Sequence, residues 1–220
     1  MKTVLFIAPL VCFAVAMLIR AEFRQQKGHI YFFKPLSTLL VIAVALLSFF
    51  QPAHDTTFSI FVIIGLLFSL GGDVALMFQQ KRIAFLIGLV SFLLGHVAYT
   101  IIFAMHTSWT MWDVLSGFLL LAAGLGFYRL IRSNLGTLKI PVIVYMLIIS
   151  VMLNRALATM MSPDFQPNQA VMIAAGAFLF YLSDVMLAAN KFWKSWPYHR
   201  ISLVFYYAGQ FLIALSASHS

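Results

Sequence analysis

The sequence predicts an all-α membrane protein whose chain crosses the bilayer eight times. Of its 220 residues, 63% are hydrophobic and 9% are charged, whereas soluble domains have roughly 25% charged and 45–50% apolar residues. The apolar residues form long continuous runs and do not alternate with polar ones, as they would in barrel strands. This pattern excludes a water-soluble globular enzyme, and the short connections leave no room for a soluble nucleotide-binding domain.

Each apolar run is close to the roughly 20 residues that a membrane-spanning helix needs. The first run follows Lys2, as a signal peptide would, but it ends at Arg20 without a small-residue cleavage site, so we expect a retained helix. We therefore treat residues 1–220 as a single polytopic membrane domain. The predicted spans are residues 3–20, 32–50, 58–78, 83–105, 112–131, 140–161, 169–190 and 201–218.

The basic residues mark one side of the membrane. Twelve of the fourteen Lys and Arg residues lie at or beside alternate connections: Arg20, Arg24, Lys27, Lys34, Lys81, Arg82, Arg129, Arg132, Lys139, Lys191, Lys194 and Arg200. The positive-inside rule makes this side cytoplasmic, so an even number of spans places both termini on the other side. The net charge of +8 then indicates contact with anionic membrane lipids and not with nucleic acid. The short loops favour a bacterial cytoplasmic (inner) membrane.

An internal repeat relates the two parts of the chain. Gly65 precedes Asp73 by eight residues, as Gly176 precedes Asp184, and each aspartate is followed by Val and, three positions on, by Leu. This predicts two parallel four-helix halves, 1–108 and 109–220, related by an axis along the membrane normal. Chance similarity between apolar helices is the alternative.

Asp73 and Asp184 are the candidate catalytic residues. Each lies about seven residues from the cytoplasmic end of its span, or roughly 10 Å deep at 1.5 Å per residue. Because a charge inside the bilayer is costly, an intramembrane carboxylate indicates a functional site. The alternative is a structural carboxyl group that hydrogen-bonds to Ser69, Ser183 or a tyrosine. If the two aspartates face each other, one can act as acid and the other as base, which suits a hydrolysis.

Other polar residues in the spans are candidates for substrate binding. Lys34, Lys191 and Arg200 lie at the cytoplasmic boundary, where they either set the topology or hold a lipid phosphate. His96 lies deep in its span and either contacts substrate or bridges helices. Asn190 and Gln210 could hydrogen-bond to substrate or between helices, whereas Arg155 is expected to extend to the outer interface. Two aspartates and one histidine at unequal depth do not make a convincing metal site, so no metal is predicted.

With these residues in place, the sequence resembles the YhhN family of membrane proteins, whose characterised members are lysoplasmalogenases. The resemblance covers nearly the whole chain and is carried by Lys34-Pro35-Leu36-Ser37, Gly72-Asp73-Val74-Ala75-Leu76, Gly95-His96-Val97-Ala98-Tyr99 and Phe180-Tyr181-Leu182-Ser183-Asp184-Val185-Met186-Leu187. It adds Tyr99 to the candidate substrate-binding residues. It implies cleavage of the vinyl-ether bond of lysoplasmalogens into a fatty aldehyde and glycerophosphocholine or glycerophosphoethanolamine.

The paired carboxyl groups are compatible with that chemistry, because a vinyl ether hydrolyses when its β-carbon is protonated and water captures the resulting oxocarbenium ion. Neither a metal nor another cofactor is required, and none is predicted. Two other functions compete with this interpretation. A proton-coupled transporter of a small or lipid-like substrate could also use intramembrane carboxylates. A zinc-dependent lipid amidase would need several intramembrane histidines, of which the sequence offers only His96.

Overall fold

The computed structural model describes residues 2–51, 54–197 and 199–219, and helices are the only regular elements in these ranges. The predicted all-helical membrane class is confirmed. Seven of the described helices are long and apolar enough to cross a membrane. The α-helices are α1 (Lys2–Phe23), α2 (Lys27–Leu46), α3 (Thr56–Leu76), α4 (Arg82–Met105), α5 (Met111–Ile131), α6 (Lys139–Ala158), α7 (Pro167–Phe192) and α8 (Ser202–Ser216).

Every predicted span overlaps one of these helices, and no boundary differs by more than five residues. The largest shift is at the start of α2, because α1 and α2 are joined by a tight turn in which Gln25 adopts a φ of 52°. The polar segment that follows this turn is helical. The last helix, α8, has 15 residues and is shorter than the others, so its crossing of the bilayer stays a prediction.

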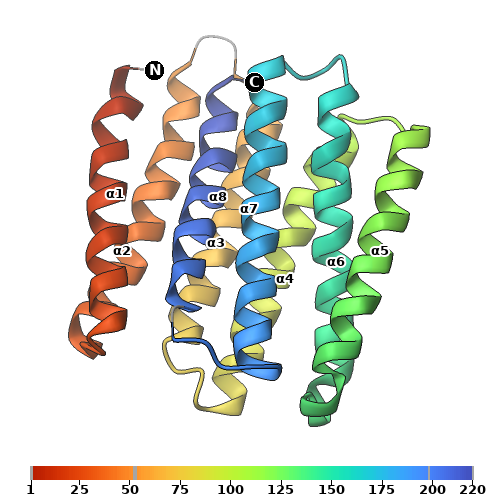
Figure 1. Cartoon of the computed structure of the whole chain (residues 1–220). Coiled ribbons are helices and arrows are strands. Elements are labelled where there is room, and N and C mark those ends of the chain that lie inside the picture. Colours follow the sequence, from red (N-terminus) through yellow and green to blue (C-terminus); the bar gives the residue numbers. More distant parts are fainter. Residues whose placement is uncertain (1, 52–53, 198, 220) are drawn as a thin grey trace.

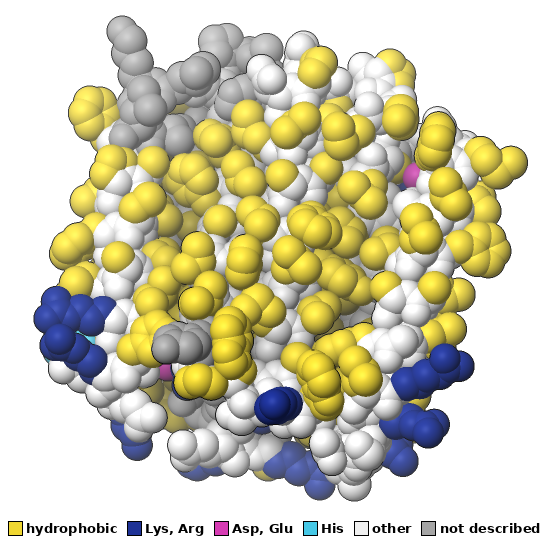
Figure 2. All heavy atoms as spheres, viewed as in Figure 1, with side chains coloured by type: hydrophobic (Ala, Val, Ile, Leu, Met, Phe, Trp, Pro, Cys, Tyr) yellow, Lys and Arg dark blue, Asp and Glu magenta, His cyan; other side chains and the backbone are white. Residues whose placement is uncertain are grey.

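The helices stand side by side, and both chain ends lie at the same end of the bundle (Figure 1). Helices α1 and α5 lie at opposite edges, and α3, α4, α7 and α8 lie between them. Helix α5 is the least buried of the candidate spans, and its buried residues are Asp113 and Ile131. The basic side chains on the visible face gather at the end away from the termini, and hydrophobic side chains cover the rest (Figure 2).

Glycines allow two pairs of helices to approach closely. A Cβ atom on Gly95 of α4 would lie 3.0 Å from the carbonyl oxygen of Gly65 in α3. In the same way, a Cβ atom on Gly176 of α7 would lie 2.9 Å from the carbonyl oxygen of Gly209 in α8. Small residues at helix contacts allow backbone approach in a membrane, where packing replaces the hydrophobic effect as the driving force. The close α3–α4 and α7–α8 pairs form the centre of the bundle.

Arg155 does not extend to the interface as the sequence predicted. Its side chain is 2% exposed, and Nη2 lies 2.5 Å from Oδ1 of Asp113, which is equally buried. The guanidinium carbon lies 3.9 Å from the ring centroid of Trp109, and Asn154 accepts hydrogen bonds from two of its nitrogens. The expectation was wrong because α5 provides a buried counter-ion, so the guanidinium group stays inside the protein.

Candidate active site

Asp73 lies in the last turn of α3, and three groups from other helices surround its carboxylate. The hydroxyl of Thr38 in α2 donates a 2.6 Å hydrogen bond to Oδ2, and that of Tyr206 in α8 donates a second one of 2.7 Å. The ammonium group of Lys34, one turn before Thr38, lies 3.7 Å from Oδ1. Asp73 is 2% exposed. Two hydroxyl donors and one cation thus hold this buried carboxyl group in a fixed orientation.

Asp184 lies in α7, eight residues before the end of that helix, and has a different set of partners. The hydroxyl of Tyr145 in α6 donates a short hydrogen bond to Oδ2. Nε2 of His96 in α4 lies 3.3 Å from the same oxygen and 3.0 Å from the Tyr145 hydroxyl. The imidazole is fully buried against the ring of Phe180, at a centroid distance of 4.7 Å. The side chain of Asp184 is 14% exposed, compared with 3% for the side chain of Asp73, so Asp184 is the more accessible of the two.

Both carboxyl groups line one cavity of about 340 Å³ that lies at the basic end of the bundle. Its wall has four cationic side chains and three carboxylates, so the formal balance is one positive charge. The cations are Lys27, Lys34, Lys81 and Arg200, and the carboxylates are Glu22, Asp73 and Asp184. We call this space the polar cavity. It suits a substrate with an anionic group next to a polar reacting bond.

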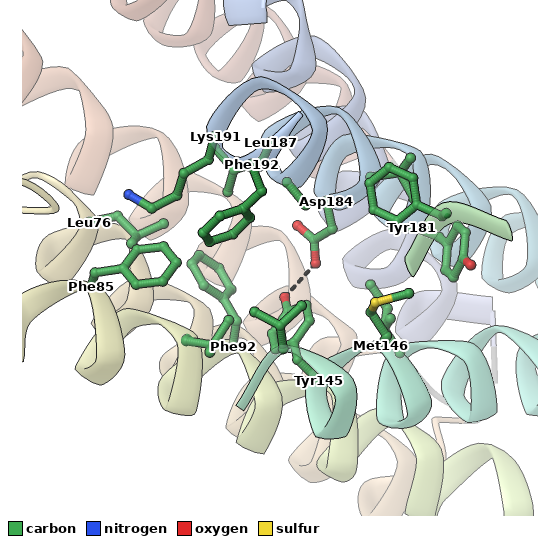
Figure 3. A pocket seen from close by; sticks show the side chains of 16 residues that line it. Leu76, Phe85, Phe92, Tyr145, Met146, Tyr181, Asp184, Leu187, Lys191 and Phe192 are labelled. Atoms are coloured by element: carbon green, nitrogen blue, oxygen red, sulfur yellow. Dashed lines mark hydrogen bonds between the residues drawn. The ribbon is translucent and has the colours of Figure 1, made fainter. Parts of the chain in front are cut away.

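A second, smaller cavity of about 80 Å³ adjoins the first, and we call it the apolar cavity. Leu76, Phe92, Asp184 and Leu187 line both cavities. The close-up shows Asp184 with its hydrogen bond to Tyr145 among aromatic and aliphatic side chains (Figure 3). Phe92 can pack beside Asp73 because Gly72 has no side chain; a Cβ atom there would lie 2.5 Å from the Phe92 ring. Asp184 therefore stands at the boundary between an apolar and a charged space.

The structure brings four of the predicted site residues to the polar cavity. Besides the two aspartates, these are Lys34 and Arg200, whose Nη1 atom lies 3.2 Å from Oε2 of Glu22. Lys191 lines the apolar cavity instead, with its ammonium group 4.1 Å from the centroid of the Phe85 ring.

The other predicted binding residues lie behind the cavities or beside them. His96 supports Asp184 from the protein interior. The hydroxyl of Tyr99 donates a 3.2 Å hydrogen bond to Gln210, and both side chains are buried. Oδ1 of Asn190 accepts from the backbone N–H of Trp196 in the α7–α8 connection. These contacts join helices or shape a loop, so a direct contact with substrate stays a prediction for all four residues. Among the described residues, no group of three or more His, Cys, Asp or Glu side chains is placed to hold a metal ion.

The structure adds three residues that the sequence analysis missed. Thr38, Tyr145 and Tyr206 are the hydroxyl donors to the two carboxylates. Thr38 could have been found, because it follows Lys34 by four residues and so shares its face of the helix. Tyr145 and Tyr206 lie in other helices than their aspartates, 39 and 133 residues away in the chain, and no local spacing indicates them.

Comparisons with known proteins identify the family of this chain. The YhhN family model matches residues 29–217. Lysoplasmalogenase TMEM86A from Bos taurus is 34% identical over 173 residues, which are 78% of this chain and 70% of that protein. The Homo sapiens protein of the same name is 33% identical over 175 residues, with the same shares. The membrane protein YhhN from Escherichia coli O157:H7 is 29% identical over 208 residues, or 94% of this chain and 95% of its own. No solved structure matches the chain. The chain belongs to the YhhN family of membrane proteins.

Proposed function

We propose that this protein hydrolyses the vinyl-ether bond of lysoplasmalogens and releases a fatty aldehyde with glycerophosphocholine or glycerophosphoethanolamine. The observation that carries the proposal is that both intramembrane aspartates line a single cationic cavity. The relatives named lysoplasmalogenase, at 33% and 34% identity, support the same reaction. They favour a hydrolase over a proton-coupled transporter.

The two cavities match the two ends of such a substrate. A lysoplasmalogen has one alkenyl chain and one phosphate-containing headgroup, with the vinyl ether between them. The apolar cavity suits the start of the chain, and the polar cavity suits the phosphate, beside Lys34 and Arg200. The vinyl ether then lies at the boundary of the cavities, where Asp184 lines both and Asp73 lines the polar side.

This placement assigns different roles to the two carboxyl groups. Asp184 is next to the chain side, so we assign it the transfer of a proton to the β-carbon of the vinyl ether. Both of its observed contacts are made to Oδ2, and Oδ1 is the oxygen that we assign to the transferred proton. Asp73, held by two hydroxyl donors and Lys34, is the carboxylate that stabilises the positive charge and activates water.

The reaction balances without a further reactant. Protonation of the β-carbon uses the electrons of the C=C bond and leaves an oxocarbenium ion at the ether carbon. Water adds to that carbon and gives a proton to Asp73, forming a hemiacetal. The C–O bond to glycerol then breaks, the glycerol oxygen takes up the proton held by Asp73, and the hemiacetal hydroxyl loses its proton to Asp184. The products are one aldehyde and one alcohol, and both carboxyl groups return to their starting states.

The contacts also support the proposal that 1–108 and 109–220 are related halves. In each half the second helix donates a hydroxyl to the aspartate of the third, from Thr38 to Asp73 and from Tyr145 to Asp184. The fourth helix of each half contacts the aspartate of the other half, through Tyr206 and His96. A pseudo-twofold axis along the membrane normal would produce this exchange.

Aldehyde release by the purified protein tests the proposal. A lysolipid with a vinyl-ether chain is the substrate, and the matching lysolipid with a saturated alkyl ether is the control, because it offers no C=C bond to protonate. We expect stoichiometric aldehyde and glycerophospho-alcohol from the first only. Failure to release aldehyde from choline or ethanolamine lysoplasmalogens would contradict the proposal.

A further inference from the structure

Two aromatic side chains form part of the polar cavity at its outer edge. The rings of Tyr31 in α2 and Phe78, in the turn after α3, have centroids 5.6 Å apart and planes inclined by 33°. Both residues line the cavity that contains the two aspartates. They are 43% and 46% exposed, which leaves much of each ring available for contact. Aromatic residues are common at membrane interfaces, but a pair on the wall of a charged cavity is also a surface for a cationic ligand.

Four polar or aromatic side chains of α2 follow one another along the helix, beginning next to Asp73 and ending at the basic end of the bundle. Thr38, Lys34, Tyr31 and Lys27 are separated by four, three and four residues, so they share one face of the helix. Thr38 and Lys34 contact Asp73, and Tyr31 lies about one turn further toward the basic end. One turn rises about 5.4 Å. This is comparable to the two-carbon linker that joins a phosphate to the ammonium group of choline or ethanolamine.

A carboxylate completes this part of the cavity. Glu22, near the end of α1, lines the polar cavity with Tyr31 and Phe78, and its side chain is 10% exposed. Its Oε2 atom is paired with Arg200, which spans from the α7–α8 connection to α1. Glu22 and Arg200 therefore place one negative and one positive group on the same wall of the cavity. A zwitterionic headgroup requires both, because it has an ammonium group and a phosphate.

From these positions we infer that Tyr31, Phe78 and Glu22 form a subsite for the ammonium group of a phospho-amino-alcohol headgroup. The aromatic faces contact the cation, Glu22 balances its charge, and Lys34 with Arg200 holds the adjoining phosphate. This inference rests on the proposed function and adds the residues that recognise the amine of the headgroup. Quaternary and primary ammonium groups share the required charge, and the quaternary group of choline has the larger apolar surface for the rings.

The test compares substrates that differ in headgroup and carry the same alkenyl chain. Purified full-length protein in nanodiscs is given alkenyl lysolipids carrying phosphocholine, phosphoethanolamine or a bare phosphate without an amine. We expect Tyr31→Leu and Phe78→Leu each to lower the kcat/KM ratio of the choline substrate over the amine-free one by about 3- to 30-fold, the range of a cation–π contact. The ethanolamine ratio should fall less, and Glu22→Gln should lower both. Because each ratio comes from one preparation, loss of folded protein cancels.

Phe32→Leu is the matched control, because Phe32 neighbours Tyr31 in α2 and is 62% exposed, and among the described residues it does not line the polar cavity. Its ratio should stay at the wild-type value. Unchanged ratios in Tyr31→Leu and Phe78→Leu, or an equal fall in Phe32→Leu, would overturn the inference.

A binding measurement separates this inference from the hydrolase proposal. Alkyl-ether lysolipids with phosphocholine or bare phosphate are titrated against the same proteins, since their binding requires no cleavage. If the wild-type protein cleaves no vinyl ether but Tyr31→Leu weakens the binding of the phosphocholine lipid more than that of the bare-phosphate lipid, the reaction is contradicted and the subsite is supported. Equal weakening for both headgroups would overturn the subsite whatever the reaction.

Discussion

The hydroxyl of Tyr206 donates a 2.7 Å hydrogen bond to Oδ2 of Asp73, a residue 133 positions earlier in the chain. The tyrosine ring packs against Phe92 and Phe180 at centroid distances of 5.8 and 5.2 Å, which holds the hydroxyl in place. Helix α8 thus orients the carboxyl group of Asp73 in helix α3. Tyr145 of α6 donates to Asp184 of α7, so each aspartate accepts a hydrogen bond from a tyrosine of another helix.

Removing either tyrosine hydroxyl should slow the reaction without unfolding the protein. Hydrogen bonds to charged groups contribute about 1.5–3 kcal/mol, so we expect Tyr206→Phe and Tyr145→Phe each to lower kcat by about tenfold or more. KM should change less, because neither hydroxyl is placed against the headgroup. Steady-state kinetics with a lysoplasmalogen checks this, and Tyr181→Phe, which alters another tyrosine of the apolar cavity, should keep kcat near the wild-type value. Wild-type kcat in both variants would mean that the hydroxyls only support packing.

Asp73→Asn and Asp184→Asn should each lower kcat at least a hundredfold. Each change keeps the size of the side chain but removes a proton-transfer group, and general acid–base steps contribute roughly 10²–10⁴-fold. The double variant should be little worse than the worse single one, because the groups act as a unit. Aldehyde release by monodisperse protein is the measurement. Asp164→Asn, in the exposed α6–α7 connection, is the control. Near-normal turnover in either single variant contradicts the mechanism, and collapse of both in detergent indicates a structural role.

Lys34 and Arg200 should give different kinetic results. Both line the polar cavity, but Lys34 also lies 3.7 Å from Asp73, whereas Arg200 pairs with Glu22 at the edge. Arg200→Met should therefore raise KM with little effect on kcat, as expected when uniform binding is removed. Lys34→Met should raise KM and also lower kcat. Identical effects of the two variants on kcat would show that Lys34 does not assist Asp73.

The close approach of α7 and α8 should make Gly176 sensitive to substitution. A Cβ atom there meets backbone, namely the carbonyl oxygen of Gly209 at 2.9 Å, and also a side-chain carbon of Ile213 at 2.9 Å. We expect Gly176→Ala to destabilise the protein by about 1–3 kcal/mol, as overpacking does, and to lower Tm in detergent. Gly126→Ala is the control, because no atom lies within 4 Å of its added Cβ. A wild-type Tm for Gly176→Ala would mean that the helices separate freely at this contact.

Both chain ends should lie on the side of the membrane opposite the basic end of the bundle, where the polar cavity lies. The termini share one end of the bundle, and the visible Lys and Arg side chains gather at the other (Figures 1 and 2). By the positive-inside rule the basic end faces the cytoplasm. A reporter fused after Ser220 should therefore behave as non-cytoplasmic, as a periplasmic fusion does in a bacterial inner membrane. Cytoplasmic activity of that reporter would contradict an even number of spans.

The helical membrane class and the presence of two aspartates inside apolar helices could be predicted from the sequence, because both depend on local properties. Continuous apolar runs fix the helices within a few residues. The equal depth of the aspartates stays a prediction, since α3 ends three residues after Asp73 and α7 ends eight residues after Asp184. The two aspartates stood out because a carboxylate in an apolar run is costly wherever the helix is placed. Lys34 and Arg200 at the boundary followed from the ends of the same apolar runs.

Only the tertiary structure decided which side chains share a cavity. Tyr206 and Asp73 are brought together by the packing of α8 near α2 and α3, and the rotation of each helix determines whether a residue faces the cavity, the interior or lipid. Seven or eight nearly uniform apolar helices carry little periodicity that reveals this rotation, so His96, Tyr99 and Gln210 could not be distinguished from cavity residues beforehand. Arg155 shows the same limit: its buried ion pair with Asp113 required α5 and α6 to pack together, and the free energy of a charge in the membrane depends on the partner that this packing provides.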